Sequence, residues 1–210
     1  MSMEDKVKWV YSSKNDDELT KRYDVWAKSY EQELEAQFGY RKLGPEPAVD
    51  VFVKYVSPDA RILDAGAGTG LVGEILAKRG YEQIIAMDIS PGMLKQAEQK
   101  KVYKALHQGT LGSTLDFPTA SFDAIISVGV FTYGHAKSNA FDELIRITNP
   151  GGYIIFTLPV ELYENSDFKT KLISLEFASK WSKVKATEPV MCHLKQDHNV
   201  QLQIWVYKIS

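Results

Sequence analysis

The chain has 210 residues, of which 44% are hydrophobic and 25% charged, a composition typical of one globular domain and not of a disordered chain. Its 25 basic and 27 acidic residues leave a net charge of −2, which argues against a protein built to hold nucleic acid or an anionic membrane surface. A lone cysteine, Cys192, excludes an internal disulfide, and a charged N-terminus without long apolar runs predicts a cytoplasmic protein that does not enter a membrane.

The first 60 residues have a helical pattern and none of the strand signals that follow. Tyr23, Trp26 and Tyr30 recur at spacings of three and four residues, so they share one helix face. We therefore predict a single domain spanning residues 1–210, in which residues 1–60 form a helical lid on a core made by residues 61–210.

From residue 61 onwards, short apolar runs alternate with helical patterns. Strands are expected at 61–65, 84–87, 102–106, 122–128 and 153–158, and helices at 71–79, from Ser90 onwards, at 139–147 and at 167–181. Such alternation is typical of an α/β fold with a parallel sheet. Two further strands, at 184–192 and 200–209, have no helix between them and predict an antiparallel hairpin at one edge of a seven-stranded sheet.

The sharpest motif is the glycine-rich segment from Asp64 to Gly70, which lies between a predicted strand and a predicted helix. Glycines allow a tight turn and close approach of a ligand to the backbone, and the free N–H groups of the following helix point at the loop. Asp88 ends the next strand, where a carboxylate can accept hydrogen bonds from both hydroxyls of a ribose. Together these features predict a nucleoside-containing ligand at the carboxyl ends of the strands.

Two ligands of this class compete. The glycines 68, 70 and 73 match the G-x-G-x-x-G pattern of dinucleotide-binding proteins, which would make the protein an NAD-dependent oxidoreductase. In that pattern, however, the first glycine directly follows the strand, and here Gly66 holds that place. A carboxylate at Asp64 would also repel a pyrophosphate, whereas it suits the ammonium group of S-adenosylmethionine, which carries no phosphate. The electrostatics therefore favour S-adenosylmethionine.

Several segments resemble the class I S-adenosylmethionine-dependent methyltransferases over essentially the whole chain. Residues 62–70 resemble motif I, 88–94 the acidic second-strand motif, 121–126 the fourth-strand motif and 150–152 the turn before strand five. Residues 23–30, together with 90–94 and 110–112, resemble more narrowly the methyltransferase-like subfamily of the Williams–Beuren syndrome critical region. The resemblance implies a Rossmann-like sheet with helices on both faces.

The resemblance also implies which residues bind the cofactor. The residues implied are Asp64, Ala65, Gly66 and Gly68 for the methionine end, Asp88 for the ribose, Ile89 and Met93 for the adenine, Val128 and Gly129 for the sulfonium, and Tyr23 and Tyr30 as a cover from the lid. Many relatives have an acidic residue after strand three that binds the adenine amino group. Here that stretch reads Gly-Thr-Leu-Gly, so the contact is expected from the backbone or from Thr110 and Leu111.

Methyl transfer is an in-line displacement that needs no metal, and a general base helps only where the acceptor carries a proton. The candidates are His135 and Tyr133, which follow strand four. The aromatic side chains expected near the site favour a small, flat or apolar acceptor; they are Trp9, Tyr11, Tyr40, Phe131, Tyr133 and Tyr163. The leading hypothesis is O- or N-methylation of a small molecule. A protein that binds the cofactor without transferring the methyl group remains an alternative, and the oligomeric state stays open.

Overall fold

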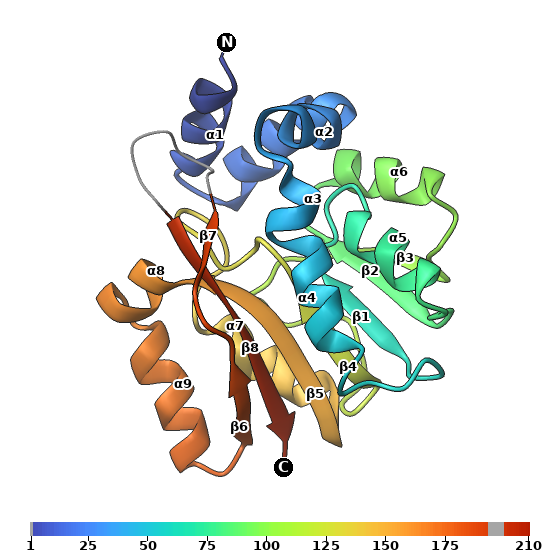
Figure 1. Ribbon diagram of the computed structural model, residues 1–210, viewed down its shortest axis with the longest axis vertical. Coiled ribbons are helices and arrows are strands. Elements are labelled where there is room, and N and C mark those ends of the chain that lie inside the picture. Colours follow the sequence, from blue (N-terminus) through green and yellow to red (C-terminus); the bar gives the residue numbers. More distant parts are fainter. Residues whose placement is uncertain (1, 193–199) are drawn as a thin grey trace.

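The computed structural model describes residues 2–192 and 200–210 and shows a mixed sheet with helices on both faces (Figure 1). Its strands are β1 (Ile62–Ala65), β2 (Ile84–Asp88), β3 (Ala105–Gln108), β4 (Phe122–Ser127), β5 (Thr148–Pro159), β6 (Trp181–Ala186), β7 (Val190–Cys192) and β8 (Val200–Ile209). Its helices are α1 (Met3–Tyr11), α2 (Asp16–Phe38), α3 (Tyr40–Leu43), α4 (Pro45–Phe52), α5 (Leu71–Lys78), α6 (Pro91–Gln99), α7 (Ala140–Ile147), α8 (Val160–Asn165) and α9 (Phe168–Phe177).

The strands follow the order β3-β2-β1-β4-β5-β8-β6, and β1 to β5 are mutually parallel. β8 is antiparallel to β5 on one side and to β6 on the other. The central strands β1 and β2 are buried along their whole length because helices cover both faces, and they are apolar except for Asp64 and Asp88. The predicted fold class, a Rossmann-like and mostly parallel sheet with an antiparallel C-terminal pair, is therefore confirmed.

Two details near the C-terminus differ from the prediction. The strand expected at 184–192 is divided into β6 and the short β7, and both pair with β8. The helix expected at 167–181 ends at Phe177, because Ser179 takes a left-handed backbone conformation with φ of 52°. Trp181 then starts β6, where its buried ring stacks on Tyr207 with 4.1 Å between the ring centroids.

The helices divide between the two faces of the sheet. Residues of α4 and α5 pack with one set of strand side chains, and residues of α7 and α9 pack with the other. Ala48, Val49 and Phe52 of α4 are fully buried in the first of these cores. Helix α4 thus belongs to the cover of the sheet, and the part of residues 1–60 that lies apart from this cover consists of α1 to α3.

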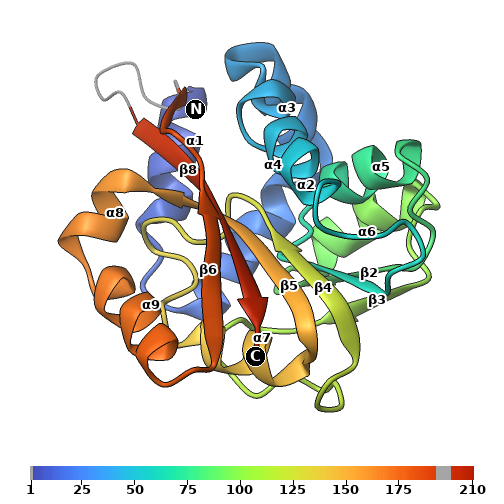
Figure 2. The same cartoon turned by 60° about the horizontal axis from the view of Figure 1, so that its bottom comes forward.

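Helices α1 and α2 lie at the end of the sheet where β8 begins (Figure 1), and Figure 2 shows the same arrangement from another side. Because β8 is antiparallel to β5, this is also the end where the parallel strands finish. The two helices share a small apolar cluster of their own that includes Val10, Trp26 and Leu34. They therefore form a separate layer over the carboxyl ends of the strands. Among the described residues, no helix has the length and apolar character needed to cross a membrane.

Candidate functional site

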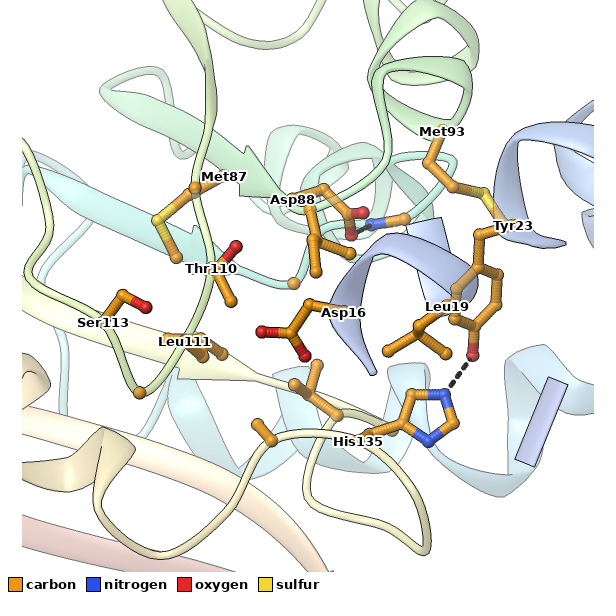
Figure 3. Close-up of a pocket in the computed structure, with 18 of the residues that line it drawn as sticks. Asp16, Leu19, Tyr23, Met87, Asp88, Met93, Thr110, Leu111, Ser113 and His135 are labelled. Atoms are coloured by element: carbon orange, nitrogen blue, oxygen red, sulfur yellow. Dashed lines mark hydrogen bonds between the residues drawn. The ribbon is translucent and has the colours of Figure 1, made fainter. Parts of the chain in front are cut away.

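A cavity of about 290 Å³ lies between α2 and the loops that follow β1, β2, β3 and β4 (Figure 3). Loops at the carboxyl ends of parallel strands are the usual ligand site of open α/β sheets. The residues predicted from the sequence that line this cavity are Tyr23, Tyr30, Gly66, Gly68, Asp88, Ile89, Met93, Thr110, Leu111, Val128, Gly129 and His135. The structure thus brings together all the predicted cofactor residues other than Asp64 and Ala65.

Asp88 presents its carboxylate to this cavity from the end of β2. Its Oδ2 accepts a hydrogen bond from the backbone N–H of Gly68 at 2.8 Å, and its Oδ1 accepts one from that of Ser90 at 2.9 Å. Burial raises the pKa of Asp88 to about 6, and the nearby carboxylate of Asp24 adds to the rise. Each carboxylate oxygen has a second lone pair, so the held side chain can still accept two hydrogen bonds from a pair of neighbouring hydroxyls.

Asp64 lies beneath the cavity and does not line it. Side chains alternate along a strand, so Asp64 points to the same face as Ile62, the face that α5 covers. There the hydroxyl of Tyr103 donates a hydrogen bond to Oδ2 of Asp64 at 2.6 Å. Burial raises the pKa of Asp64 to about 7.

The same tyrosine explains the last glycine of the G-x-G-x-x-G match. The backbone N–H of Gly73 donates to the hydroxyl of Tyr103 at 3.2 Å. A Cβ atom at Gly73 would lie 2.3 Å from the Tyr103 ring, so a larger residue has no room there. The spacing that resembles a dinucleotide motif therefore reflects the packing of Tyr103 against α5.

A second, smaller cavity of about 80 Å³ adjoins the first. Its walls are mostly aromatic and aliphatic and come from α1, α2, α3, the loop after β4, the end of β5 and the start of β8. They include Val7, Tyr11, Trp26, Leu34, Tyr40, Phe131, Tyr133, Val200 and Leu202. Tyr23, Tyr30, Val128 and Gly129 line both cavities. A ligand in the first cavity could therefore face a second molecule in the smaller one across these four residues.

His135 and Tyr23 form a hydrogen-bonded pair at this junction. The hydroxyl of Tyr23 lies 2.6 Å from Nε2 of His135, and Nδ1 of His135 lies 2.7 Å from the backbone carbonyl oxygen of Tyr133. Because a carbonyl can only accept, Nδ1 carries the proton and Nε2 accepts from Tyr23. Burial lowers the pKa of His135, which keeps the ring neutral near pH 7. The side chain of Tyr133 lines the second cavity instead.

Polar contacts fasten α2 to the core. Oδ1 of Asp24 accepts hydrogen bonds from the hydroxyl of Ser90 at 2.6 Å and from the backbone N–H of Gly92 at 2.7 Å. Two helix turns after Asp24, the carboxylate of Glu31 accepts a hydrogen bond from the hydroxyl of Thr69 at 2.9 Å. These contacts join α2 to the loops after β1 and β2, which also border the cavity.

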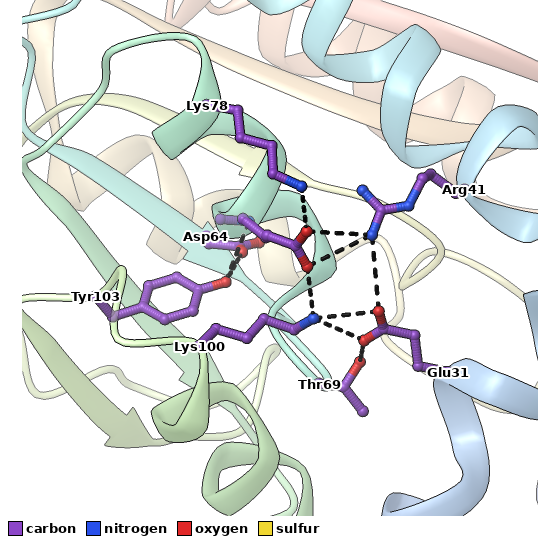
Figure 4. A network of polar contacts seen from close by, with 9 residues as sticks. Glu31, Arg41, Asp64, Thr69, Lys78, Lys100 and Tyr103 are labelled. Atoms are coloured by element: carbon purple, nitrogen blue, oxygen red, sulfur yellow. Dashed lines mark hydrogen bonds and ion pairs between the residues drawn. The ribbon is translucent and has the colours of Figure 1, made fainter.

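Glu31 also enters a charged network that joins α2 and Arg41 of α3 to the helices of the core (Figure 4). Lys100 lies 2.9 Å from Glu31 and 2.8 Å from Glu74, and Arg41 lies 3.4 Å from Glu74. Burial alone would raise the pKa of Glu74, but hydrogen bonds from Lys100 and Lys78 outweigh it and lower that pKa to about 2. Glu74 of the folded protein is therefore ionised at neutral pH.

Sequence reasoning missed several residues that the structure places in or around the cavity. Asp16 and Leu19 line it from the first turns of α2, and Tyr103 supports the glycine loop from below. The acidic run at 16–18 is typical of an ordinary helix start, since Asn15 caps α2 through its side chain. No local pattern in the sequence distinguishes Asp16 from its neighbours.

Comparison with known proteins identifies the family. Residues 63–156 match a family model described as a methyltransferase domain. Methyltransferase-like protein 27 of Homo sapiens is 37% identical over 166 residues, which cover 76% of this chain and 66% of the human protein. The chain belongs to the class I S-adenosylmethionine-dependent methyltransferases.

A further relative is also a methyltransferase, and a solved structure shares the fold. The malonyl-(acyl-carrier protein) O-methyltransferase of Serratia marcescens is 36% identical over 102 residues, or 48% of this chain and 38% of that protein. A TehB-like S-adenosylmethionine-dependent methyltransferase from Corynebacterium glutamicum superposes with a TM-score of 0.63 at 19% identity, over 90% of this chain and 99% of that one. This methyltransferase chain thus spans about two thirds of its human relative and well under half of the Serratia relative.

The cofactor of the methyltransferase is S-adenosylmethionine, and the residues of the larger cavity fit it. The buried carboxylate of Asp88 suits the two ribose hydroxyls, and the apolar side chains of Ile89 and Met93 suit a flat base. Membership of this family argues against the alternative of an NAD-dependent oxidoreductase. Within residues 2–192 and 200–210, no group of three or more metal-binding side chains occurs; His193 and His198 lie outside the described residues.

Ligand binding should order the lid of this methyltransferase. We expect S-adenosylhomocysteine to slow amide hydrogen exchange across residues 10–45, because α2 borders the cavity through Asp16, Tyr23 and Tyr30. Helix α9, whose residues pack in the core beside α7, serves as an internal control and should not change. Protection confined to residues 64–70 and to Asp88 would contradict the lid.

Proposed function

We propose that this protein transfers the methyl group of S-adenosylmethionine to an oxygen or nitrogen atom of a small, flat or apolar acceptor. The acceptor would bind in the smaller of the two cavities. The observation that carries the proposal is the junction of the two cavities, which share Tyr23, Tyr30, Val128 and Gly129. An acceptor in the smaller cavity would meet the larger cavity at this junction. The apolar walls of the smaller cavity favour an acceptor with little charge. The Serratia relative is named as an O-methyltransferase, which supports an oxygen acceptor.

The bound cofactor supplies an activated methyl group on a sulfonium, so the protein has to align the acceptor and exclude water. Trp26 and Tyr30 of α2 close the smaller cavity on the lid side. Val128 and Gly129 follow β4 and form the wall that both cavities share. These residues would hold the acceptor atom in line with the bond that breaks.

The Tyr23 and His135 pair would remove the proton of an acceptor hydroxyl or amine. Tyr23 lines both cavities, so its hydroxyl oxygen can take the acceptor's proton while its own proton passes to Nε2 of His135, 2.6 Å away. The acceptor atom then bonds to the methyl carbon as the carbon–sulfur bond breaks, and S-adenosylhomocysteine is released. Burial raises the pKa of Tyr23 well above its usual value, so the hydroxyl remains neutral and able to relay the proton.

The test is a methyl-transfer assay with methyl-labelled S-adenosylmethionine and a library of phenols, carboxylic acids and amines. On an acceptor found with the wild type, His135→Gln should lower kcat by roughly 10²- to 10⁴-fold, as expected for loss of a general base. The kcat of Tyr23→Phe should fall to a similar extent. The affinity of His135→Gln for S-adenosylhomocysteine, measured by calorimetry, should change little.

His107→Gln is the matched control, since His107 lies on β3 with its ring against Phe117 and lines neither cavity. It should keep full activity. A wild-type protein that binds S-adenosylmethionine but methylates nothing in the library would contradict the proposal and favour a binding protein without transfer. Equal kcat in His135→Gln and wild type would exclude the base assigned here.

A further inference from the structure

The smaller cavity, in which the acceptor is proposed to bind, is called the acceptor cavity below. The end of the larger cavity that lies away from it has an uncharged wall. The loop after β3 contributes Gly109, Thr110, Leu111, Gly112 and Ser113 to it. None of these residues carries a charge, and their side chains offer two hydroxyls at most. This wall therefore provides no anionic acceptor for a hydrogen-bond donor on a ligand.

The position of the adenine follows from the two ends of the cavity. The residues around Tyr23 and Val128 adjoin the acceptor cavity, so the sulfonium has to lie there for transfer. Asp88 suits the ribose, which lies between the sulfonium and the base in S-adenosylmethionine. The base then extends from Asp88 away from the acceptor cavity. This direction leads towards Thr110 and Leu111 (Figure 3).

Asp16 points its carboxylate into this part of the cavity. It lines the cavity from the first turn of α2, and Figure 3 shows its carboxylate on the side of Thr110 and Leu111, away from His135. Asp16 and Asp88 are the carboxylates among the described lining residues, beside one cation, Lys137. Helix capping does not occupy the side chain of Asp16, because Asn15 accepts from the backbone N–H of Glu18 at 2.9 Å.

We propose that Asp16 accepts a hydrogen bond from the exocyclic amino group of the cofactor's adenine. An ionised carboxylate only accepts hydrogen bonds, and an amino group on the base donates them. A purine with a carbonyl oxygen at the same position would instead place an acceptor against the carboxylate. Asp16 thus makes the cavity selective for a 6-aminopurine over a 6-oxopurine.

The assignment gives α2 two roles along one helix. Asp16 contacts the base at its start, and Tyr23 reaches the junction of the cavities two turns later. Closure of the lid is then favoured by the correct base as well as by the acceptor. The inference rests on the proposed function, from which the position of the sulfonium is taken, but its test measures binding alone and requires no methyl transfer.

Calorimetry with two ligands tests it without an acceptor. The probes are S-adenosylhomocysteine and S-inosylhomocysteine, which differ at this position of the purine. The wild type should bind the adenosyl ligand about tenfold more tightly, the effect of one charge-assisted hydrogen bond at a partly exposed site. Asp16→Ala should lose most of this preference, chiefly by weaker binding of the adenosyl ligand.

Asp17→Ala is the matched control, because Asp17 occupies the same first turn of α2 but does not line the cavity. It should bind both ligands like the wild type. An Asp16→Ala variant that keeps the preference, or that binds both ligands equally more weakly, would overturn the inference. Absence of methyl transfer would leave it standing, whereas a wild type that binds neither ligand would overturn it together with the cofactor assignment.

Discussion

Replacement of Asp88 by alanine should weaken the binding of S-adenosylhomocysteine by about ten- to a hundredfold, the loss expected for about 1.5–3 kcal/mol of charge-assisted hydrogen bonding. The carboxylate is buried and held by the backbone N–H groups of Gly68 and Ser90, so its orientation is fixed before a ligand binds. Calorimetry at pH 8 measures the effect. Asp116→Ala, an exposed change in the loop that follows β3, should bind like the wild type.

The raised pKa of Asp88 predicts how the affinity for S-adenosylhomocysteine depends on pH. The pKa of Asp88 is raised to about 6 by burial, so the free protein takes up a proton there as the pH falls through that value. Ribose hydroxyls that donate to both oxygens favour the ionised form, so binding must expel the proton. Affinity should therefore fall below pH 6, by up to about tenfold per pH unit, and Asp88→Asn should lack this dependence. If Asp88→Ala remains folded and binds as tightly as the wild type, Asp88 does not hold the ribose.

Replacement of Gly66 by alanine should lower the free energy of unfolding by about 2–5 kcal/mol, from backbone strain and overpacking together. Gly66 has a φ of +78°, and a Cβ atom there would lie 2.3 Å from Cγ2 of Val130. The thermal midpoint of unfolding, measured without ligand, reports the loss. Cofactor binding should weaken as well, because Gly66 and Val130 both line the larger cavity.

Gly68→Ala separates the two causes. Gly68 also has a positive φ, of +54°, but a Cβ atom there would meet nothing within 4 Å. It should cost about 1–2 kcal/mol from strain alone. Val130→Ala should restore part of the stability of Gly66→Ala by removing the steric contact. Equal destabilisation by the two glycine variants, with no rescue, would show that Val130 does not restrict this loop.

The parts of the fold that depend on local pattern could be predicted from the sequence. The buried strands, the glycine loop and Asp88 at the end of β2 are each encoded in one short segment, and the structure has them near the expected places. The end of α9 could not be predicted this way, because Phe177 and Trp181 have helical spacing. Trp181 leaves that pattern to stack on Tyr207, which is 26 residues further along the chain.

The site shows the same division. Asp64 precedes the loop as expected, but its surroundings depend on Tyr103, which lies 39 residues away in the sequence, beyond α5, β2 and α6. The contribution of α2 depends on how a helix outside the sheet packs on α6, through Asp24 and Gly92. Such contacts between distant segments leave no periodic signal, so Asp16 could be found only in the folded protein.

The placement of β8 imposes an order of assembly. β8 lies between β5 and β6, and β6 pairs with β8 and not with β5. During synthesis on the ribosome, residues 62–159 can therefore build five parallel strands while the edge of β5 is still unpaired. Residues 181–186 have to wait until 200–209 emerge and enter beside β5. A chain stopped before Val200 would expose a long strand edge, which is a template for aggregation.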